Sequence, residues 1–116
     1  MKWFRLEEFN CTHTNLNFMD STFLEQLDEL RERVGFPMIV TSGYRDATHP
    51  AEARKEKPGT HNQGIAADIK VSNGFERMNI VHEAIKMGVF NGIGVHKDFI
   101  HLDTRTTTPV LWSYYS

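Results

Sequence analysis

The pattern of hydrophobic and polar residues is clearest between residues 21 and 34, STFLEQLDELRERV. Its apolar positions recur at spacings of four, three and four, at Phe23, Leu27, Leu30 and Val34. This spacing places them on one face of a helix and the charged residues on the other face. We therefore predict a helix over 21–34, capped by Ser21 and ended by Gly35.

A second helical pattern runs from about residue 75 to residue 87. Met78, Val81 and Ile85 recur there at spacings of three and four, and we expect them on the buried face. Gly88 follows directly and is a natural C-cap, because glycine adopts the left-handed conformation that ends many helices.

Short apolar runs outside these helices predict strands. They are residues 38–40, 65–71, 93–96 and 99–103, the last two joined by a turn near Lys97-Asp98. The apolar end of the chain, VLWSYYS, fits an edge strand or a loose segment. The polar segment 46–60 reads as a long loop with one helical turn around residues 51–55, and loops of this length are usually functional or mobile.

The order of these elements is helix, strand, loop, strand, helix, strand, strand. The close pair of strands after the second helix favours antiparallel pairing over a doubly wound parallel sheet. We therefore expect an α+β fold, with a small antiparallel sheet and two main helices. Because no linker or repeat divides the chain, we expect one domain over residues 1–116.

Composition excludes several classes of function. A net charge of −2 offers no basic surface for nucleic acid, and no run approaches the roughly 18 apolar residues of a membrane span. The start of the chain does not resemble a secretory signal. Its one cysteine, Cys11, cannot form an internal disulfide and is expected to be a small buried side chain. What remains notable is the number of histidines, which is six.

Two of these histidines stand in patterns that suggest a metal site. On the strand 65–71, Asp68 and Ala66 point away from the core, whereas Ile65, Ala67 and Ile69 point into it. His61 precedes this strand and can fold back over it, because Gly64 permits a tight bend. On the strand 99–103, His101 and Asp103 share the face opposite to the apolar residues Ile100 and Leu102.

If the two strands lie side by side, His101 joins His61 and Asp68. Two His and one Asp are a three-ligand set with an open fourth position, which is typical of catalytic zinc. A further carboxylate would then serve as general base, and Asp98 and Asp103 are the candidates. The alternative is that these are ordinary surface or hydrogen-bonded residues, which is the interpretation we give to His13, His49 and His82. For Trp3 and Trp112 we expect a packing role.

The order of these residues resembles the peptidase M15 family. His61-x-x-Gly64-x-Ala66-x-Asp68 is similar to its H-x-x-G-x-A-x-D motif, and Asp98-x-x-His101 is similar to the acid-x-x-His that closes its site. Ser42-Gly43-Tyr44-Arg45 resembles the S-G-Y-R segment that precedes them, and Glu8-Phe9-x-Cys11 the start of small phage-type members. The resemblance extends from about residue 8 to 105 and implies a fold like that of D-Ala-D-Ala peptidases and hedgehog proteins.

The resemblance also implies a set of roles. Zn²⁺ would be held by His61, Asp68 and His101, with Asp98 as general base. Arg45 would bind a substrate carboxylate or steady the oxyanion, which suits its forked and permanently charged guanidinium. Ser42 and Tyr44 would line the substrate cleft.

The chain departs from the family pattern at two positions. Gly59 stands where many members have Ser, and Asp98 stands where they have the longer Glu. Strict alternation would also place Asp98 opposite to His101, unless the chain turns at Lys97-Asp98. Asp103 shares the face of His101 and is the reserve base or the partner that orients this ligand.

We therefore expect a zinc peptidase acting on the peptide stems or cross-links of bacterial peptidoglycan, as carboxypeptidase or endopeptidase. The expected partner is the peptidoglycan peptide, with no nucleic acid and no membrane, and the protein is expected to be a monomer. We expect synthesis in the cytoplasm without a signal peptide, and delivery to the cell wall by a phage or at lysis. The alternatives are a non-catalytic, metal-stabilised binding module and a phage tail or assembly component.

Overall fold

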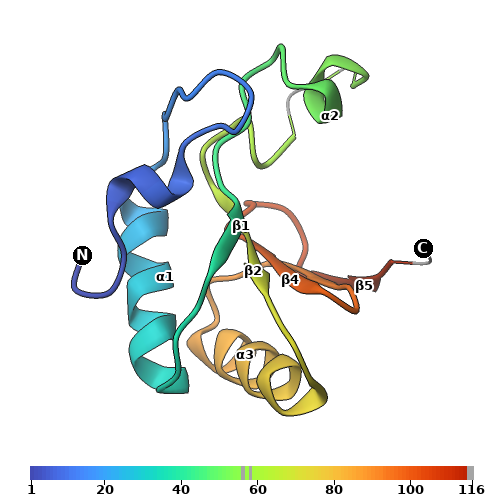
Figure 1. Ribbon diagram of the computed structural model, residues 1–116. Coiled ribbons are helices and arrows are strands. Elements are labelled where there is room, and N and C mark those ends of the chain that lie inside the picture. The colour runs from blue at the N-terminus through green and yellow to red at the C-terminus, as the bar shows by residue number, and fades with distance from the viewer. Residues whose placement is uncertain (56, 58, 115–116) are drawn as a thin grey trace.

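The computed structural model describes residues 1–55, 57 and 59–114, and within them it has the predicted α+β fold. Three helices, one 3₁₀ turn and five strands alternate along these residues (Figure 1). In chain order they are η1 (Leu6–Phe9), α1 (Ser21–Val34), β1 (Val40–Ser42), α2 (Pro50–Ala53), β2 (Ala66–Lys70), α3 (Gly74–Met87), β3 (Gly92–Val95), β4 (Phe99–Asp103) and β5 (Val110–Ser113).

Helix α1 has the predicted bounds and the predicted buried face. Phe23, Leu27 and Leu30 are buried, as the apolar spacing requires. The N-cap differs from the prediction, because the carboxylate of Asp20 accepts a hydrogen bond from the backbone N–H of Phe23. Ser21 is instead the first residue of the helix. At the other end, Gly35 adopts φ 78° and ends the helix.

Helix α3 is present, but of its predicted buried face only Val81 packs against the core. Met78 and Ile85 are 67% and 58% exposed, whereas Ile80 and Ala84 are fully buried. The helix carries two apolar stripes, and periodicity alone does not say which one meets the sheet. Among the described residues, no helix is long and apolar enough to cross a membrane.

The five strands form one sheet in the order β1-β2-β4-β3-β5. Three neighbouring pairs are antiparallel, as predicted, while β5 runs parallel to β3. This parallel pair has a topological cause. Strand β5 begins at the end of the sheet where β4 stops, since Asp103 and Val110 both lie opposite Gly92. After the short connection past β3, the chain therefore runs antiparallel to β4 and parallel to β3. The apolar segment near the end of the chain is thus an edge strand.

The two faces of the sheet are covered differently. Helices α1 and α3 lie against one face (Figure 1), where Ala67, Ile69, Ile100 and Leu102 join the hydrophobic core. The alternate residues of β2 and β4 point to the other face, as the period of a strand requires. Ile65 does not join the core, contrary to expectation, because β2 begins one residue later and Ile65 lines a pocket instead.

Candidate metal centre

The pairing of β2 with β4 brings two of the predicted ligands together. Asp68 lies directly opposite His101 in this register. His61 reaches them from the turn before β2, where Gly64 adopts φ 76°. A side chain at Gly64 would place its Cβ within 2.2 Å of the carbonyl oxygen of Phe18, so only glycine fits this turn. One ligand atom from each of His61, Asp68 and His101 lies within 4.8 Å of the other two.

The hydrogen bond on the outer side of His61 determines where its proton lies. Its Nδ1 is 2.7 Å from the carbonyl oxygen of Gly43. Because a carbonyl only accepts, Nδ1 carries the hydrogen and donates it. In the neutral ring Nε2 then bears the lone pair, and this atom lies 3.3 Å from Oδ1 of Asp68.

His101 is oriented in the same way, but by a carboxylate. Its Nε2 donates to Oδ2 of Asp103 at 2.7 Å, and its Nδ1 lies 3.0 Å from Oδ1 of Asp68. Arg105 fixes Asp103 in turn through two side-chain hydrogen bonds, Nε to Oδ1 at 2.8 Å and Nη2 to Oδ2 at 2.7 Å. A carboxylate behind a histidine is the usual support of a metal-binding imidazole.

The buried carboxylates favour positive charge in this cluster. Burial alone would raise the pKa of Asp68, but its hydrogen bonds with His101 and His61 hold that pKa well below its usual value. Likewise, burial would lower the pKa of His101, yet Asp103 and Asp68 raise it above its ordinary value. Without a metal, a proton supplies the positive charge that the carboxylates attract, and a metal cation would displace that proton.

The donor set fits zinc. Two imidazole nitrogens and one carboxylate oxygen converge, and the outer nitrogen of each ring is already occupied by an acceptor. His61, Asp68 and His101 are between 4% and 6% exposed. The lone pairs of the inner imidazole nitrogens face an oxygen of the buried carboxylate of Asp68. Without a cation or a proton between them, these lone pairs and the carboxylate oxygen would repel each other. Nitrogen and oxygen ligands, three in number, are characteristic of catalytic zinc sites.

Two glycines of β3 make room for this arrangement. A Cβ at Gly92 would lie 2.3 Å from the carboxylate oxygens of Asp103, and a Cβ at Gly94 would lie 2.7 Å from the ring of Trp112. Both contacts are too close for real side chains. The carboxylate and the indole therefore occupy the space above β3 that side chains of that strand would otherwise fill.

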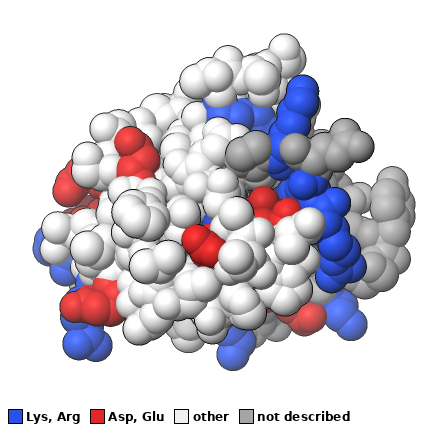
Figure 2. Space-filling model, turned by 90° about the horizontal axis from the view of Figure 1, so that it is seen from above, with Lys and Arg blue, Asp and Glu red and all other residues white. Residues whose placement is uncertain are grey.

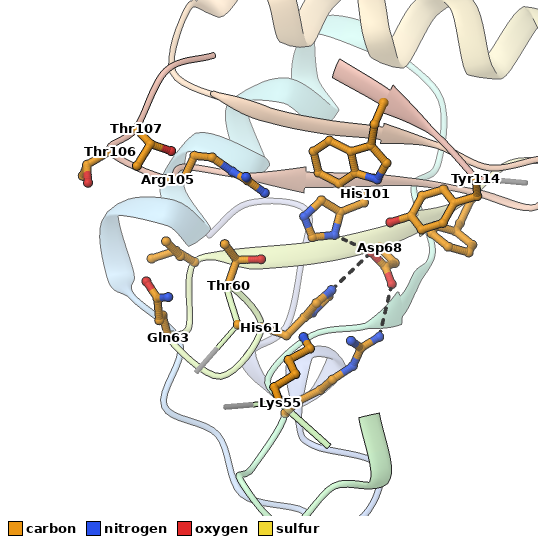
Figure 3. A pocket seen from close by; sticks show the side chains of 15 residues that line it. Lys55, Thr60, His61, Gln63, Asp68, His101, Arg105, Thr106, Thr107 and Tyr114 are labelled. Atoms are coloured by element: carbon orange, nitrogen blue, oxygen red, sulfur yellow. Dashed lines mark hydrogen bonds and ion pairs between the residues drawn. The ribbon is translucent and has the colours of Figure 1, made fainter. Parts of the chain in front are cut away.

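A pocket of about 670 Å³ opens beside the cluster, a volume typical of sites for small ligands (Figure 3). Three of its side chains are cationic, and Asp68 is the only carboxylate among the described residues that line it. Figure 2 shows basic side chains gathered towards the C-terminal side of the molecule. The pocket is lined by Arg45, Lys55, Gly59, Thr60, His61, Gln63, Ile65, Asp68, Phe99, His101, Arg105, Thr106, Thr107, Trp112 and Tyr114.

Comparison with known families agrees with this site. A family model described as Peptidase M15 matches residues 2–103, which include all three ligand candidates. The chain belongs to the peptidase M15 family. Membership of this family implies a hydrolase that cuts peptide bonds. A search of curated proteins gave no match.

Of the residues that the sequence assigns to substrate in this M15 peptidase, Arg45 lies in the pocket. Its Nη2 is 3.6 Å from Oδ2 of Asp68, and its backbone N–H donates to the carbonyl of His61. Ser42 is half-buried opposite Asp68 on β1, and Tyr44 is buried with its ring against Phe18. Neither of these two residues lines the pocket, so their roles stay predictions.

The predicted general base of the M15 peptidase also lies outside the pocket. The side chain of Asp98 is 71% exposed, and its nearest ionic partner is Nδ1 of His96 at 3.9 Å. The chain does turn at residues 97–98, as expected, but this turn directs the carboxylate to solvent. Asp103, the reserve candidate, is fully buried behind His101 and fully engaged by Arg105. The structure thus places Asp103 as the hydrogen-bond partner that orients the ring of His101.

Sequence reasoning missed one whole wall of the pocket. Trp112 was expected only to pack, yet its ring centroid lies 5.2 Å from that of His101 and it lines the pocket. Arg105 and Tyr114 were not singled out at all. One signal was available, because Asp103-x-Arg105 places an opposite charge two residues along from a candidate carboxylate. The position of β5 depends on tertiary pairing and carries no such local signal.

Proposed function

We propose that this M15 member is a zinc-dependent peptidase that hydrolyses peptide bonds in the stems or cross-links of bacterial peptidoglycan. One observation supports it above all others. The free nitrogens of His61 and His101 converge on one oxygen of Asp68, and the opposite nitrogens are held by Gly43 and Asp103. These three residues also line a pocket, which would give a substrate access to a metal bound there. A metal with a purely structural role would not require such access.

His61, Asp68 and His101 would hold the metal. When bound, zinc supplies a Lewis acid that activates water and polarises a carbonyl group. The chain contributes the orientation, because Gly43 and Asp103 keep both imidazoles in the tautomer that points its lone pair inwards.

The charge of the pocket favours an anionic substrate. Arg45, Lys55 and Arg105 contribute to its walls, while its one described carboxylate is a proposed ligand. The guanidinium of Arg45 suits a carboxylate or a developing oxyanion, since it can donate two parallel hydrogen bonds. Stem peptides of peptidoglycan carry free carboxylates along their length and at their ends. This match supports the proposed substrate class.

Transfer of a proton requires a group that reaches the reacting atoms. We propose Asp98 for this role, as the resemblance implies, with the requirement that the turn at residues 96–98 carries its carboxylate into the pocket. Asp103 would act through His101 and not on the substrate. Substitution of Asp98 should therefore lower the cleavage rate, whereas substitution of Asp103 should lower the zinc affinity.

The proposal is tested by incubating the purified protein with Zn²⁺ and either peptidoglycan or synthetic stem peptides. We expect cleavage that disappears with a chelator, returns with Zn²⁺ and is lost in His101→Ala. His82→Ala is the matched control, because it removes an exposed histidine of α3 outside the site. Zinc binding without cleavage of any stem peptide would contradict the proposed activity.

That negative outcome would favour the alternative of a metal-stabilised binding module or a phage component. The exposed position of Asp98 supports this alternative, because a site without a proton acceptor is a poor catalyst. In this case removal of zinc would lower the unfolding temperature, and binding of peptidoglycan fragments would persist without turnover.

A further inference from the structure

The pocket has a wall that lies outside the matched region of the family. The family model ends at residue 103, whereas β5 and the residues around it follow that point. Strand β5 pairs with β3 so that Trp112 lies opposite Gly94, which is itself opposite His101. This register carries Tyr114, the residue after the strand, to the mouth of the metal cluster. Trp112 and Tyr114 are therefore pocket residues that the family match does not account for.

Tyr114 lines the pocket beside the cluster. Its backbone N–H donates to the carbonyl of Val95 at 3.2 Å, which continues the β3–β5 pairing by one residue. Its ring lies edge-on to Phe99 and His96, at centroid distances of 5.3 Å and 5.5 Å. Phe99 and His96 are stacked on each other at 4.4 Å. The phenol ring thus packs edge-on against this stacked pair.

The hydroxyl of Tyr114 points from this position into the pocket, towards His101 and Asp68 (Figure 3). Its ring also lies beside that of Trp112, with 6.3 Å between the ring centroids. Indole N–H can only donate, so a hydrogen bond between these two side chains leaves the phenol oxygen as the acceptor. The proton of the phenol therefore stays available for donation into the pocket. Burial raises the pKa of the Tyr114 phenol, which favours its protonated form.

We propose that Tyr114 is a catalytic residue of the proposed peptidase, whose hydroxyl donates a hydrogen bond to the oxygen of the scissile carbonyl as negative charge develops there. The inference rests on the proposed function and deepens it. Arg45 enters from the loop after β1, whereas Tyr114 enters from the end of β5, so the oxygen would be approached from two walls. The phenol keeps its proton throughout, and no bond of the side chain is broken.

The test compares Tyr114→Phe with the wild-type protein, since this change removes the hydroxyl and keeps the ring. Thr108→Val is the matched control, because it removes an exposed hydroxyl of the same segment that does not line the pocket. For each protein we would measure kcat and KM on a stem peptide and the zinc affinity. We would also measure, by calorimetry, the affinity for a phosphinate dipeptide, whose tetrahedral phosphorus carries two oxygens that share one negative charge. The measurement of phosphinate binding can be made even if the protein does not cleave the stem peptide.

We expect Tyr114→Phe to lower kcat and phosphinate affinity by about 100-fold, which is the usual loss when one oxyanion donor is removed. KM, zinc affinity and the urea midpoint should stay within about twofold of wild type. Unchanged kcat and unchanged phosphinate affinity would overturn the inference and leave the proposed function intact. A parallel loss of zinc affinity would also overturn it, since Tyr114 would then support the metal cluster. If wild type cleaves nothing, the peptidase proposal fails, and a weakened phosphinate complex would still identify Tyr114 as the donor.

Discussion

Strand β4 has two faces that are equally buried and differently stabilised. Ile100 and Leu102 are fully buried among the core residues beneath the helices, while Asp103 is fully buried and His101 is 5% exposed on the opposite face. The apolar face is stabilised by burial and close packing, and it tolerates any partner of suitable shape. On the polar face each atom needs one particular partner, because an unpaired polar group is costly in the interior.

The comparison teaches that burial does not distinguish a core from a site. What distinguishes the polar face is directed pairing, from Arg105 to Asp103, from Asp103 to His101 and from His101 to Asp68. The apolar face should therefore govern folding, and the polar face should govern metal binding. Substitutions on the two faces of the same strand separate these effects.

The largest effect is expected for His101→Ala. Loss of a ligand should reduce zinc affinity by more than about 100-fold, which exceeds the range typical of partners that only orient a ligand. Cleavage of stem peptides should be lost with it. Competition with a chromogenic chelator measures the affinity, and His82→Ala serves as control. Retention of tight zinc binding by His101→Ala would show that the cluster is not the metal site.

Leu102→Ala, the next residue along, should show the opposite profile. Truncation of a fully buried leucine typically costs about 2–5 kcal/mol of the free energy of unfolding, because it leaves a cavity. Urea unfolding of the metal-free protein measures this loss. The folded fraction should still bind one zinc ion with nearly wild-type affinity. A cost below about 1 kcal/mol would contradict the separation of the two faces.

Asp103→Asn should have an intermediate effect, confined to the metal. The amide cannot hold the proton of His101 as the carboxylate does, so zinc affinity should fall by about 10- to 100-fold. The same chelator competition measures it, and excess Zn²⁺ should restore most of the cleavage rate. If cleavage vanishes while zinc affinity is unchanged, Asp103 is the general base and not a positioning residue.

Asp98→Asn is expected to have the smallest effect on zinc affinity, within about twofold, because its carboxylate lies outside the cluster. Its effect on kcat decides whether the turn at residues 96–98 moves. A loss of more than tenfold in kcat at saturating zinc would support Asp98 as general base. An unchanged kcat would refute that assignment and leave the exposed position seen here as the functional one.

The sequence was sufficient for the parts of the molecule that depend on local pattern. The bounds of α1 and the alternation along β4 follow from spacing and period. The approach of His101 to Asp68 was predicted on the condition that their strands are neighbours, and the pairing of β2 with β4 meets that condition. The buried face of α3 did not follow, because that helix carries two apolar stripes and the choice between them depends on the sheet. The cluster was found because its three ligands lie in one motif and one strand.

The remaining pocket could not be predicted, for a physical reason. Trp112 and Tyr114 reach the cluster only because β5 adds to β3 in parallel, and no local pattern specifies that partner. Asp98 illustrates the reverse case. Its motif position predicts a catalytic role, but the conformation of the turn at residues 97–98 decides where its carboxylate lies.

The contact between Trp112 and His101 gives the molecule an optical reporter. The chain has two tryptophans, and the other, Trp3, stacks against Arg31 and hydrogen-bonds to Glu32, away from the pocket. The indole of Trp112 lies 5.2 Å from a ring whose charge changes when a cation replaces a proton. Its emission would thus register occupancy of the cluster without any label. In a variant that lacks Trp3, one fluorophore would follow binding in real time.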